Sequence, residues 1–222
     1  TLERVLQTRF AAIYGAGERR APGTTSVRAL VTNYDENVRA QYWRLDSYIR
    51  QNVESIVGVP LQQLTRYVST DVYTIRPIDG AGQPMEVPKG RERQAFLGFV
   101  DGLESHVQIV EGTNLTPGLT PEGDIPIIAN FAAANELNLA VGDRFVYSDA
   151  PSFDPNGLRI QIVGVWLADD PDSDYWLFDP YLFNNVFLLS IGEENLFEQV
   201  LPRLPQAGNE FTWYSIFDHK GI

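Results

Sequence analysis

Histidine is the side chain that most often binds metals and takes up protons near neutral pH. The sequence has two histidines, His106 and His219. Neither has a partner at the spacing of a metal site, so we expect a structural or solvent role for both. Cysteine is absent, which excludes disulfides, zinc–thiolate sites, iron–sulfur clusters and thiol nucleophiles.

One acidic run has the spacing that opens a calcium-binding loop. Its aspartates Asp170, Asp172 and Asp174 alternate with other residues. A calcium loop then requires a glycine and, further on, a bidentate glutamate. Tyr175 and Tyr181 stand at those two positions. We therefore expect a solvated acidic loop and predict no metal site.

Motifs for nucleophilic or phosphate chemistry are missing from the sequence. It contains no G-x-S-x-G elbow and no H-E-x-x-H pair. Gly15 and Gly17 have neither a strand before them nor the lysine of a phosphate-binding loop after them. We predict that the chain is not an enzyme, with no catalytic, cofactor-binding or metal-binding residues and no cofactor.

Two other functions stay open from the residues alone. A hydrolase could use paired carboxylates, and it would need two acids that face one cleft. A secreted carbohydrate-binding module would need an exposed, coplanar aromatic platform. Its candidate residues are Trp166, Tyr175, Trp176, Trp213 and Tyr214; in strands, such aromatics are more typical of a core.

Charge is divided unevenly along the 222 residues. Residues 1–111 have 13 basic and 13 acidic side chains, whereas residues 112–222 have 4 and 16, so the net charge of −12 belongs to the second half. Nucleic-acid binding is disfavoured because it needs cations, and anionic lipids would repel the second half. Arginine outnumbers lysine by 15 to 2, which we interpret as the signature of a GC-rich bacterial genome.

The elements that would position any site follow from hydrophobic periodicity. Apolar residues step by three and four from Val38 to Ile56 and predict a long helix, begun at Asp35 and stopped by Gly58 and Pro60. We predict further helices at 2–14, 130–139 and 192–204. The predicted strands are 25–34, 64–78, 94–100, 106–112, 126–129, 158–166, 186–189 and 211–217, and residues 141–145 are predicted to be a turn that leads into a further strand. A strand–helix–strand pattern thus occurs near the start of the chain and again near its end, and the segment between them is rich in predicted strands.

Five segments, in order, resemble the extracytoplasmic domains of MacB-like permeases of the FtsX family of ABC transporters. They are HVQIVEG at 106–112, PIIA at 126–129, LNLAVGDRF at 137–145, RIQIVGV at 159–165 and WYSIFD at 213–218. The L-x-L-x-V-G-D block is the most specific of them. The resemblance covers about 180 residues, and no functional residue of the family can be assigned to a position here.

The resemblance implies an α+β fold with a split ferredoxin-like, porter-type half and an inserted, smaller β-rich subdomain. The expected division is an N-terminal helix and linker at 1–23, a porter-like subdomain at 24–102 plus 179–222, and an inserted subdomain at 103–178. The domain would lie outside the bacterial cell membrane. It would couple cytoplasmic ATP hydrolysis to the handling of a substrate or partner protein, without catalysis of its own. Its expected partners are its own transmembrane helices and the cytoplasmic ATPase subunits.

Overall fold

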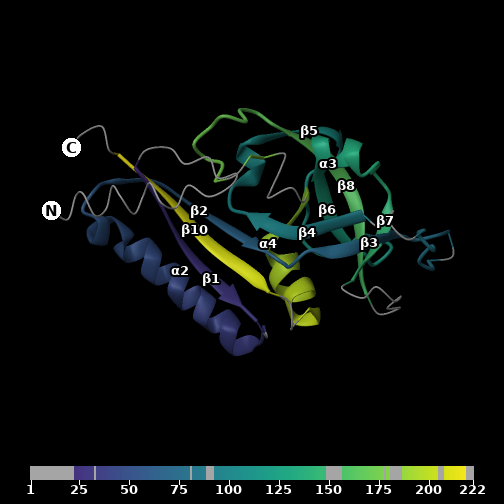
Figure 1. Cartoon of the computed structure of the whole chain (residues 1–222), viewed down its shortest axis with the longest axis horizontal. Helices are drawn as coiled ribbons and strands as arrows, with labels where there is room; N and C mark the ends of the chain where they lie inside the picture. The colour runs from purple at the N-terminus through teal and green to yellow at the C-terminus, as the bar shows by residue number, and fades with distance from the viewer. Residues whose placement is uncertain are drawn as a thin grey trace.

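A computed structural model describes residues 23–32, 34–80, 82–88, 93–148, 157–177, 179–180, 187–204 and 208–218. Strands dominate the described part, and one long helix lies beside them (Figure 1). The strands are β1 (Thr24–Val31), β2 (Leu61–Ser69), β3 (Tyr73–Pro77), β4 (Arg93–Val100), β5 (Val107–Gly112), β6 (Ile125–Asn130), β7 (Arg144–Ser148), β8 (Leu158–Ala168), β9 (Phe187–Ile191) and β10 (Asn209–Phe217). The helical segments are α2 (Glu36–Val57), η1 (Leu103–Ser105), α3 (Phe131–Glu136), α4 (Glu193–Asn195), η2 (Leu196–Val200) and η3 (Leu201–Arg203).

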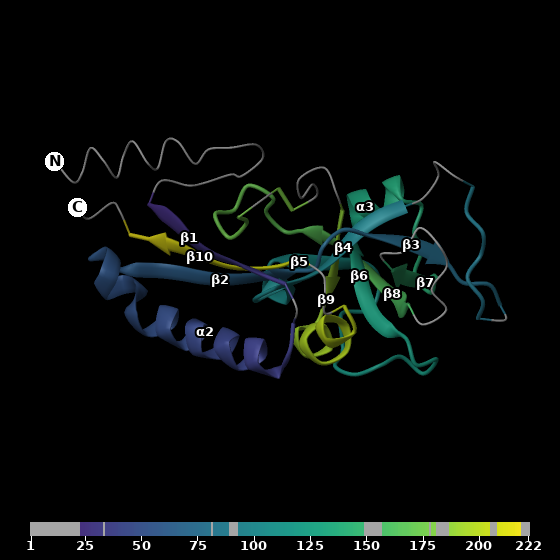
Figure 2. The same cartoon turned by 60° about the horizontal axis from the view of Figure 1, so that its bottom comes forward.

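The strands form one continuous sheet with two differently built regions. Strands β1, β10 and β2 form an open sheet that α2 covers on one face; we call these four elements the wing. Strands β4, β3, β7, β8, β6 and β9 pair in succession, and β9 pairs back to β4, which closes a ring. Strand β5 adds to β8, and β2 joins wing to ring by pairing with β4. Figure 2 shows the two regions side by side.

Helix α2 begins and ends where the sequence predicts. The Asp35 side chain accepts a 2.8 Å hydrogen bond from the Val38 amide, which satisfies a donor that a helix start leaves free. Gly58 adopts the left-handed conformation (φ 74°) and ends the helix. Predicted stripe residue Ile56 is 66% exposed, which corrects its expected place in the core.

The early and late strand–helix–strand segments share one sheet. Strand β10 pairs with both β1 and β2, and β9 pairs with β4. The late helical segment packs against α2, with ring centroids 4.8 Å apart for Tyr42 and Phe197. The predicted helix at 192–204 is broken into α4, a π-turn η2 and a 3₁₀ turn η3. Pro202 lies at the start of η3 and lacks the amide that a continuous α-helix would use.

The single strand predicted at 64–78 is wrong, because the chain breaks between β2 and β3. The break is stabilised from inside the ring by Tyr147, whose hydroxyl donates to the Asp71 carbonyl at 2.9 Å. The Thr70 and Tyr147 hydroxyls are 2.6 Å apart. Buried backbone groups that leave the sheet ladder thus find side-chain partners, as buried polar groups require.

The motifs that carry the family resemblance fall on β5, β6, the α3–β7 connection, β8 and β10. Two of their glycines, Gly112 and Gly164, lie opposite each other where β5 pairs with β8. A Cβ on Gly164 would lie 2.2 Å from the Thr113 carbonyl oxygen, and one on Gly112 would lie 2.2 Å from that of Val163. Only glycine allows this close approach of backbones.

The fold is a mixed α/β structure dominated by its sheet. Hydrogen bonds cross the boundaries of the expected inserted subdomain, since β3 pairs with β7 and β9 pairs with β6. The split ferredoxin-like arrangement and the division at 103 and 178 remain predictions. The helix predicted at 2–14 lies outside the described residues.

Candidate functional site

The structure places His106 beside the loop that holds the acidic run, since the Asp169 amide donates to the His106 carbonyl at 3.0 Å. His106 stacks on Tyr175 with ring centroids 3.6 Å apart, and His219 lies outside the described residues. In the acidic run, the Asp170 carboxylate accepts the Asp172 amide, a local turn contact. Within the described ranges, no group of three or more His, Asp or Glu side chains could hold a metal ion.

The five aromatic residues proposed as a carbohydrate platform are buried. Trp166, Tyr175, Trp176, Trp213 and Tyr214 have exposed fractions between 0% and 3%. Trp176, in the loop that follows β8, stacks on Trp166 of β8. These side chains are core residues and offer no surface to a sugar.

The main polar cluster of the described structure surrounds Arg66 of β2; we call Arg66, Arg50, Asp46, Asp101 and Glu193 the arginine cluster. The Arg66 guanidinium donates to Asp101 Oδ2 at 3.0 Å and to Glu193 Oε1 at 2.6 Å. Arg50 donates to Asp46 Oδ2 at 3.0 Å and to Asp101 Oδ2 at 3.1 Å. Arg66 and Asp46 are only 7% and 6% exposed, so much of the cluster is shielded from water.

Neighbouring aromatic side chains complete this cluster. Trp213 Nε1 donates to Asp46 Oδ1 at 2.9 Å. Arg66 also donates to the Tyr42 hydroxyl at 3.3 Å, and its guanidinium carbon lies 5.4 Å from the centre of the Phe99 ring. Cation–π contacts of this kind add to the ion pairs where water is excluded.

Burial and pairing act in opposite directions on the ionisable groups of the cluster. Burial alone lowers the pKa of Arg66, but hydrogen bonds and charges from Asp101 and Glu193 outweigh it and raise this pKa. Burial raises the pKa of Asp101, yet Arg66 and Arg50 lower it below its usual 3.8. The cluster therefore favours the fully ionised state of both partners.

The arginine cluster and Trp213 together join five elements that are distant in sequence. Asp46 comes from α2, Arg66 from β2, Trp213 from β10, Asp101 from the turn after β4 and Glu193 from α4. Such a network fixes helix and sheet in one relative position, because buried charges tolerate little change in geometry. The sequence contained one signal for it: Asp46 lies at helical spacing from buried Tyr42 and Ile49, in the middle of the apolar stripe.

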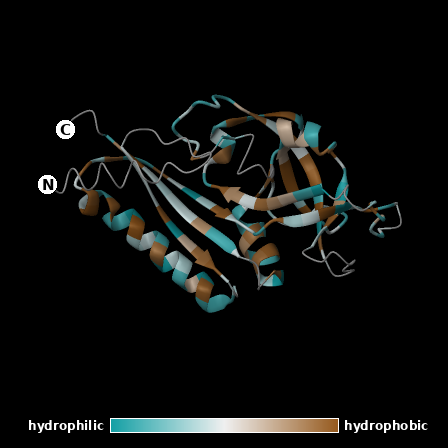
Figure 3. Cartoon of the chain, viewed as in Figure 1, coloured by the Kyte–Doolittle hydropathy of each residue, from teal (hydrophilic) through white to brown (hydrophobic). Residues whose placement is uncertain are grey.

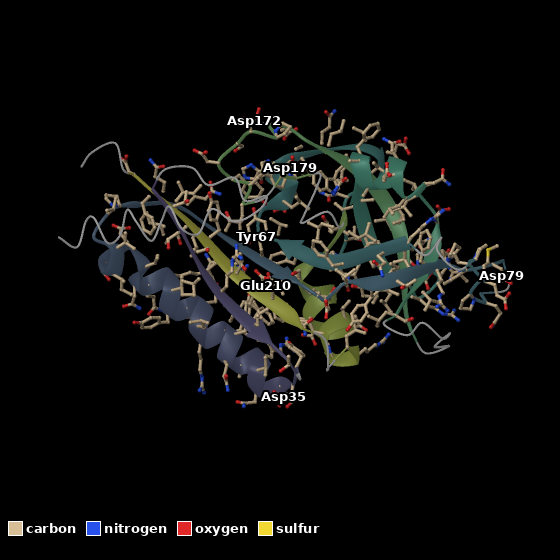
Figure 4. The ribbon with its side chains drawn as sticks, viewed as in Figure 1. Asp35, Tyr67, Asp79, Asp172, Asp179 and Glu210 are labelled. Carbon is tan, nitrogen blue, oxygen red and sulfur yellow. The ribbon has the colours of Figure 1, made fainter. Side chains whose placement is uncertain are left out.

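The opposite face of the same strands carries a groove of about 300 Å³, which we call the junction groove. Side chains alternate along a strand, so Tyr67 and Arg66 face opposite sides of the sheet. Buried Tyr67, Phe96 and Leu188 form the groove floor, and the exposed Leu30 lies at its rim. Figure 4 shows Tyr67 and Glu210 at the junction of wing and ring.

Two carboxylates, Asp71 and Glu210, line this groove. Asp71 Oδ1 accepts the Val72 amide at 2.8 Å. Glu210 accepts the Thr212 hydroxyl at 3.0 Å and lies 3.7 Å from Arg28. Gly98 leaves room here for the Leu188 side chain, because a Cβ on Gly98 would meet Leu188 Cδ1 at 2.5 Å. The groove could bind a ligand with an apolar body and a cationic group.

In comparisons with known proteins, no protein-family model matches the sequence, and no curated protein sequence matches it. Two solved structures are similar. The periplasmic region of MacB from Actinobacillus actinomycetemcomitans aligns with a TM-score of 0.42 and 10% identity, over 89% of this chain and 76% of that one. A domain of a protein named as a permease from Porphyromonas gingivalis aligns with a TM-score of 0.37 and 13% identity, over 78% and 66%.

Proposed function

We propose that the chain is the extracytoplasmic domain of an ABC-transporter permease of the MacB-like, FtsX-related type. The observation that carries this proposal is the position of the two ends of the described fold. Thr24, at the start of β1, pairs with Ile216, near the end of β10. The Phe217 amide donates to the Gly23 carbonyl at 2.9 Å. A domain placed between two membrane helices needs its entry and exit side by side, facing one bilayer surface.

The position of the ring supports the same arrangement. Strands β3 and β7 lie at the opposite end of the molecule from the start of β1 and the end of β10 (Figure 1). A ring held away from the bilayer is free to meet a substrate or a partner protein. No helix among the described residues is both long enough and apolar enough to cross a membrane.

The topology of the wing supports a porter-like half. Strands β1 and β2 are parallel and joined by α2, with antiparallel β10 between them, which is a split βαβ unit. We assign this half to residues 24–102 plus 179–222, and the inserted subdomain to residues 103–178. The arginine cluster would keep α2, β2, β10 and α4 together as one body, so that a displacement at the chain ends reaches the ring.

In this proposal, cytoplasmic ATPase subunits of the parent transporter supply the energy, and the domain transmits conformational change outside the membrane. The domain itself is non-catalytic. The test is the parent protein: the coding sequence should specify hydrophobic spans before and after this chain, and the protein should stay in the membrane after alkaline carbonate extraction. A parent without spans, or one released by carbonate, would contradict the proposal.

The hydrolase alternative has one observation in its favour, since Asp71 and Glu210 line one groove. Incubation of the purified chain with a panel of nitrophenyl glycosides tests it. We expect no product above that of the buffer. Turnover that is lost in both Asp71→Asn and Glu210→Gln would instead assign the junction groove to glycoside hydrolysis.

A further inference from the structure

The end of the molecule that holds the chain's entry and exit also holds an exposed apolar turn. This turn joins α2 to β2, and we call its residues Ile56, Val57, Val59 and Pro60 the tip. Ile56 is 66% exposed and Val57 is 42% exposed. The Asp218 amide donates to the Pro60 carbonyl at 2.9 Å, so the tip directly contacts the last described residue of the chain. Figure 3 shows this end of α2 as hydrophobic.

The tip is also free of charge, although the protein is strongly acidic. Residues 55–65 contain no charged side chain, and neither do the two adjoining strand ends, 23–27 and 211–217. The three segments meet at this end of the wing through the β1–β10 and β10–β2 pairings. An apolar tip without charged side chains of its own, on a chain of net charge −12, is suited to contact with lipid.

We infer that the tip inserts shallowly into the outer surface of the bilayer that anchors the parent protein. This inference rests on the proposed function, which places both chain ends at the membrane. The lipid that the tip would enter is zwitterionic. Two acidic residues lie at the tip, since the Glu54 carboxylate accepts the Leu61 amide and the Asp218 amide donates to the Pro60 carbonyl. The last turn of α2 has no basic residue to offset the negative end of the helix dipole.

The cysteine-free sequence allows a direct test with single labels. Val57→Cys carries an environment-sensitive fluorophore at the tip, and Met85→Cys carries the same fluorophore on the β3–β4 connection of the ring, where Met85 is 52% exposed. The full chain is tethered through a C-terminal histidine tag to phosphatidylcholine vesicles that contain a nickel-chelating lipid. Brominated phosphatidylcholine serves as the quencher.

We expect the label at position 57 to shift its emission to the blue and to be quenched, and the label at position 85 to do neither. Adding Ile56→Asp to Val57→Cys should abolish the quenching with an unchanged melting temperature, because Ile56 is exposed. Replacing part of the phosphatidylcholine with phosphatidylserine should weaken the quenching. Equal quenching at 57 and 85, or none at 57, would overturn the inference.

A blue shift at position 57 that appears without vesicles and grows with protein concentration would also overturn it, because a second copy would then cover the tip. The proposed function is tested separately by carbonate extraction of the parent protein. If the parent protein resists extraction but the tip label of the tethered chain stays unquenched, only this inference is refuted. If carbonate extracts the parent protein from the membrane, the proposed function is refuted, whatever the tethered chain shows.

Discussion

The wing and the ring both bury one face of the sheet, but the side chains in their interiors differ in kind. The ring is filled by apolar side chains such as Ile75, Leu97, Ile127, Ile160 and Ile162, each fully buried. The wing instead places charged Arg66 and Asp46 between its helix and its sheet, at 7% and 6% exposure. Figure 3 shows β6 and β8 as largely hydrophobic, whereas α2 alternates between polar and apolar turns.

The difference follows from how each region is closed. In the ring, hydrogen bonds between successive strands fix every neighbour, so non-directional apolar packing can fill the centre. The helix of the wing has no ladder that fixes its position on the sheet. Directional contacts from Trp213 to Asp46, from Arg66 to Tyr42 and from Arg50 to Asp101 define that position. We infer that the arginine cluster sets where α2 lies more than it adds net stability.

Removal of the Arg66 side chain should cause the largest loss of stability in the wing. In Arg66→Ala, the carboxylates of Asp101, Glu193 and Asp46 lose their shared cation in a partly dry site. We expect a loss of about 3–5 kcal/mol in the free energy of unfolding, measured by urea denaturation. The control is Arg44→Ala on the exposed side of α2, which should change little. A loss below about 1 kcal/mol, typical of surface ion pairs, would show that the cluster does not act as a buried network.

The corresponding destabilising substitution in the ring acts through a steric clash. Gly164→Ala puts a methyl group 2.2 Å from the Thr113 carbonyl oxygen, so β5 and β8 must separate. We expect a loss of about 2–3 kcal/mol, the upper range for overpacking. Gly192→Ala serves as the control, because its methyl group would meet nothing within 4 Å. Equal stability of the two variants would refute the close approach of β5 and β8.

Leu45→Asp should destabilise the wing through its apolar contacts. Leu45 is partly buried against the main core cluster, and an aspartate there has to lose some of its hydration. We expect a cost of about 1–3 kcal/mol, again by urea denaturation. Ser47→Asp, on an exposed position of the same helix, should be nearly neutral. A melting curve like that of the parent would mean that this face of α2 is not a packing face.

The pH dependence of stability should report on Asp101. Its folded-state pKa lies below the usual 3.8, so the stabilisation is present above that value and is lost as the pH falls through the folded-state pKa. In Asp101→Asn, the unfolding free energy should be lower at neutral pH and should fall less on acidification. Asp170→Asn, in the loop after β8, is the control. An acid-unfolding profile of Asp101→Asn identical to that of the unchanged protein would contradict the pairing with Arg66 and Arg50.

Periodicity and caps predicted most of the elements, because α2, β8 and β10 have strong local patterns. The split between β2 and β3 was missed, since Thr70 and Asp71 depend on Tyr147, which follows them by more than 70 residues. The arginine cluster was missed for the same reason. Arg66 reads as one polar residue in a strand until Asp46, Asp101 and Glu193 are brought to it. The junction groove, lined by Tyr67 and Glu210, likewise depends on strand order, which local patterns do not specify.

The most direct test of the proposed extracytoplasmic role is the side of the membrane on which the ring lies. Met85→Cys in an otherwise cysteine-free parent protein should react with a membrane-impermeant maleimide in intact cells, to the same extent as in lysed cells. A cysteine in the cytoplasmic ATPase subunit serves as the control and should react only after lysis. Labelling of Met85→Cys only after lysis would place the ring in the cytoplasm and contradict the account.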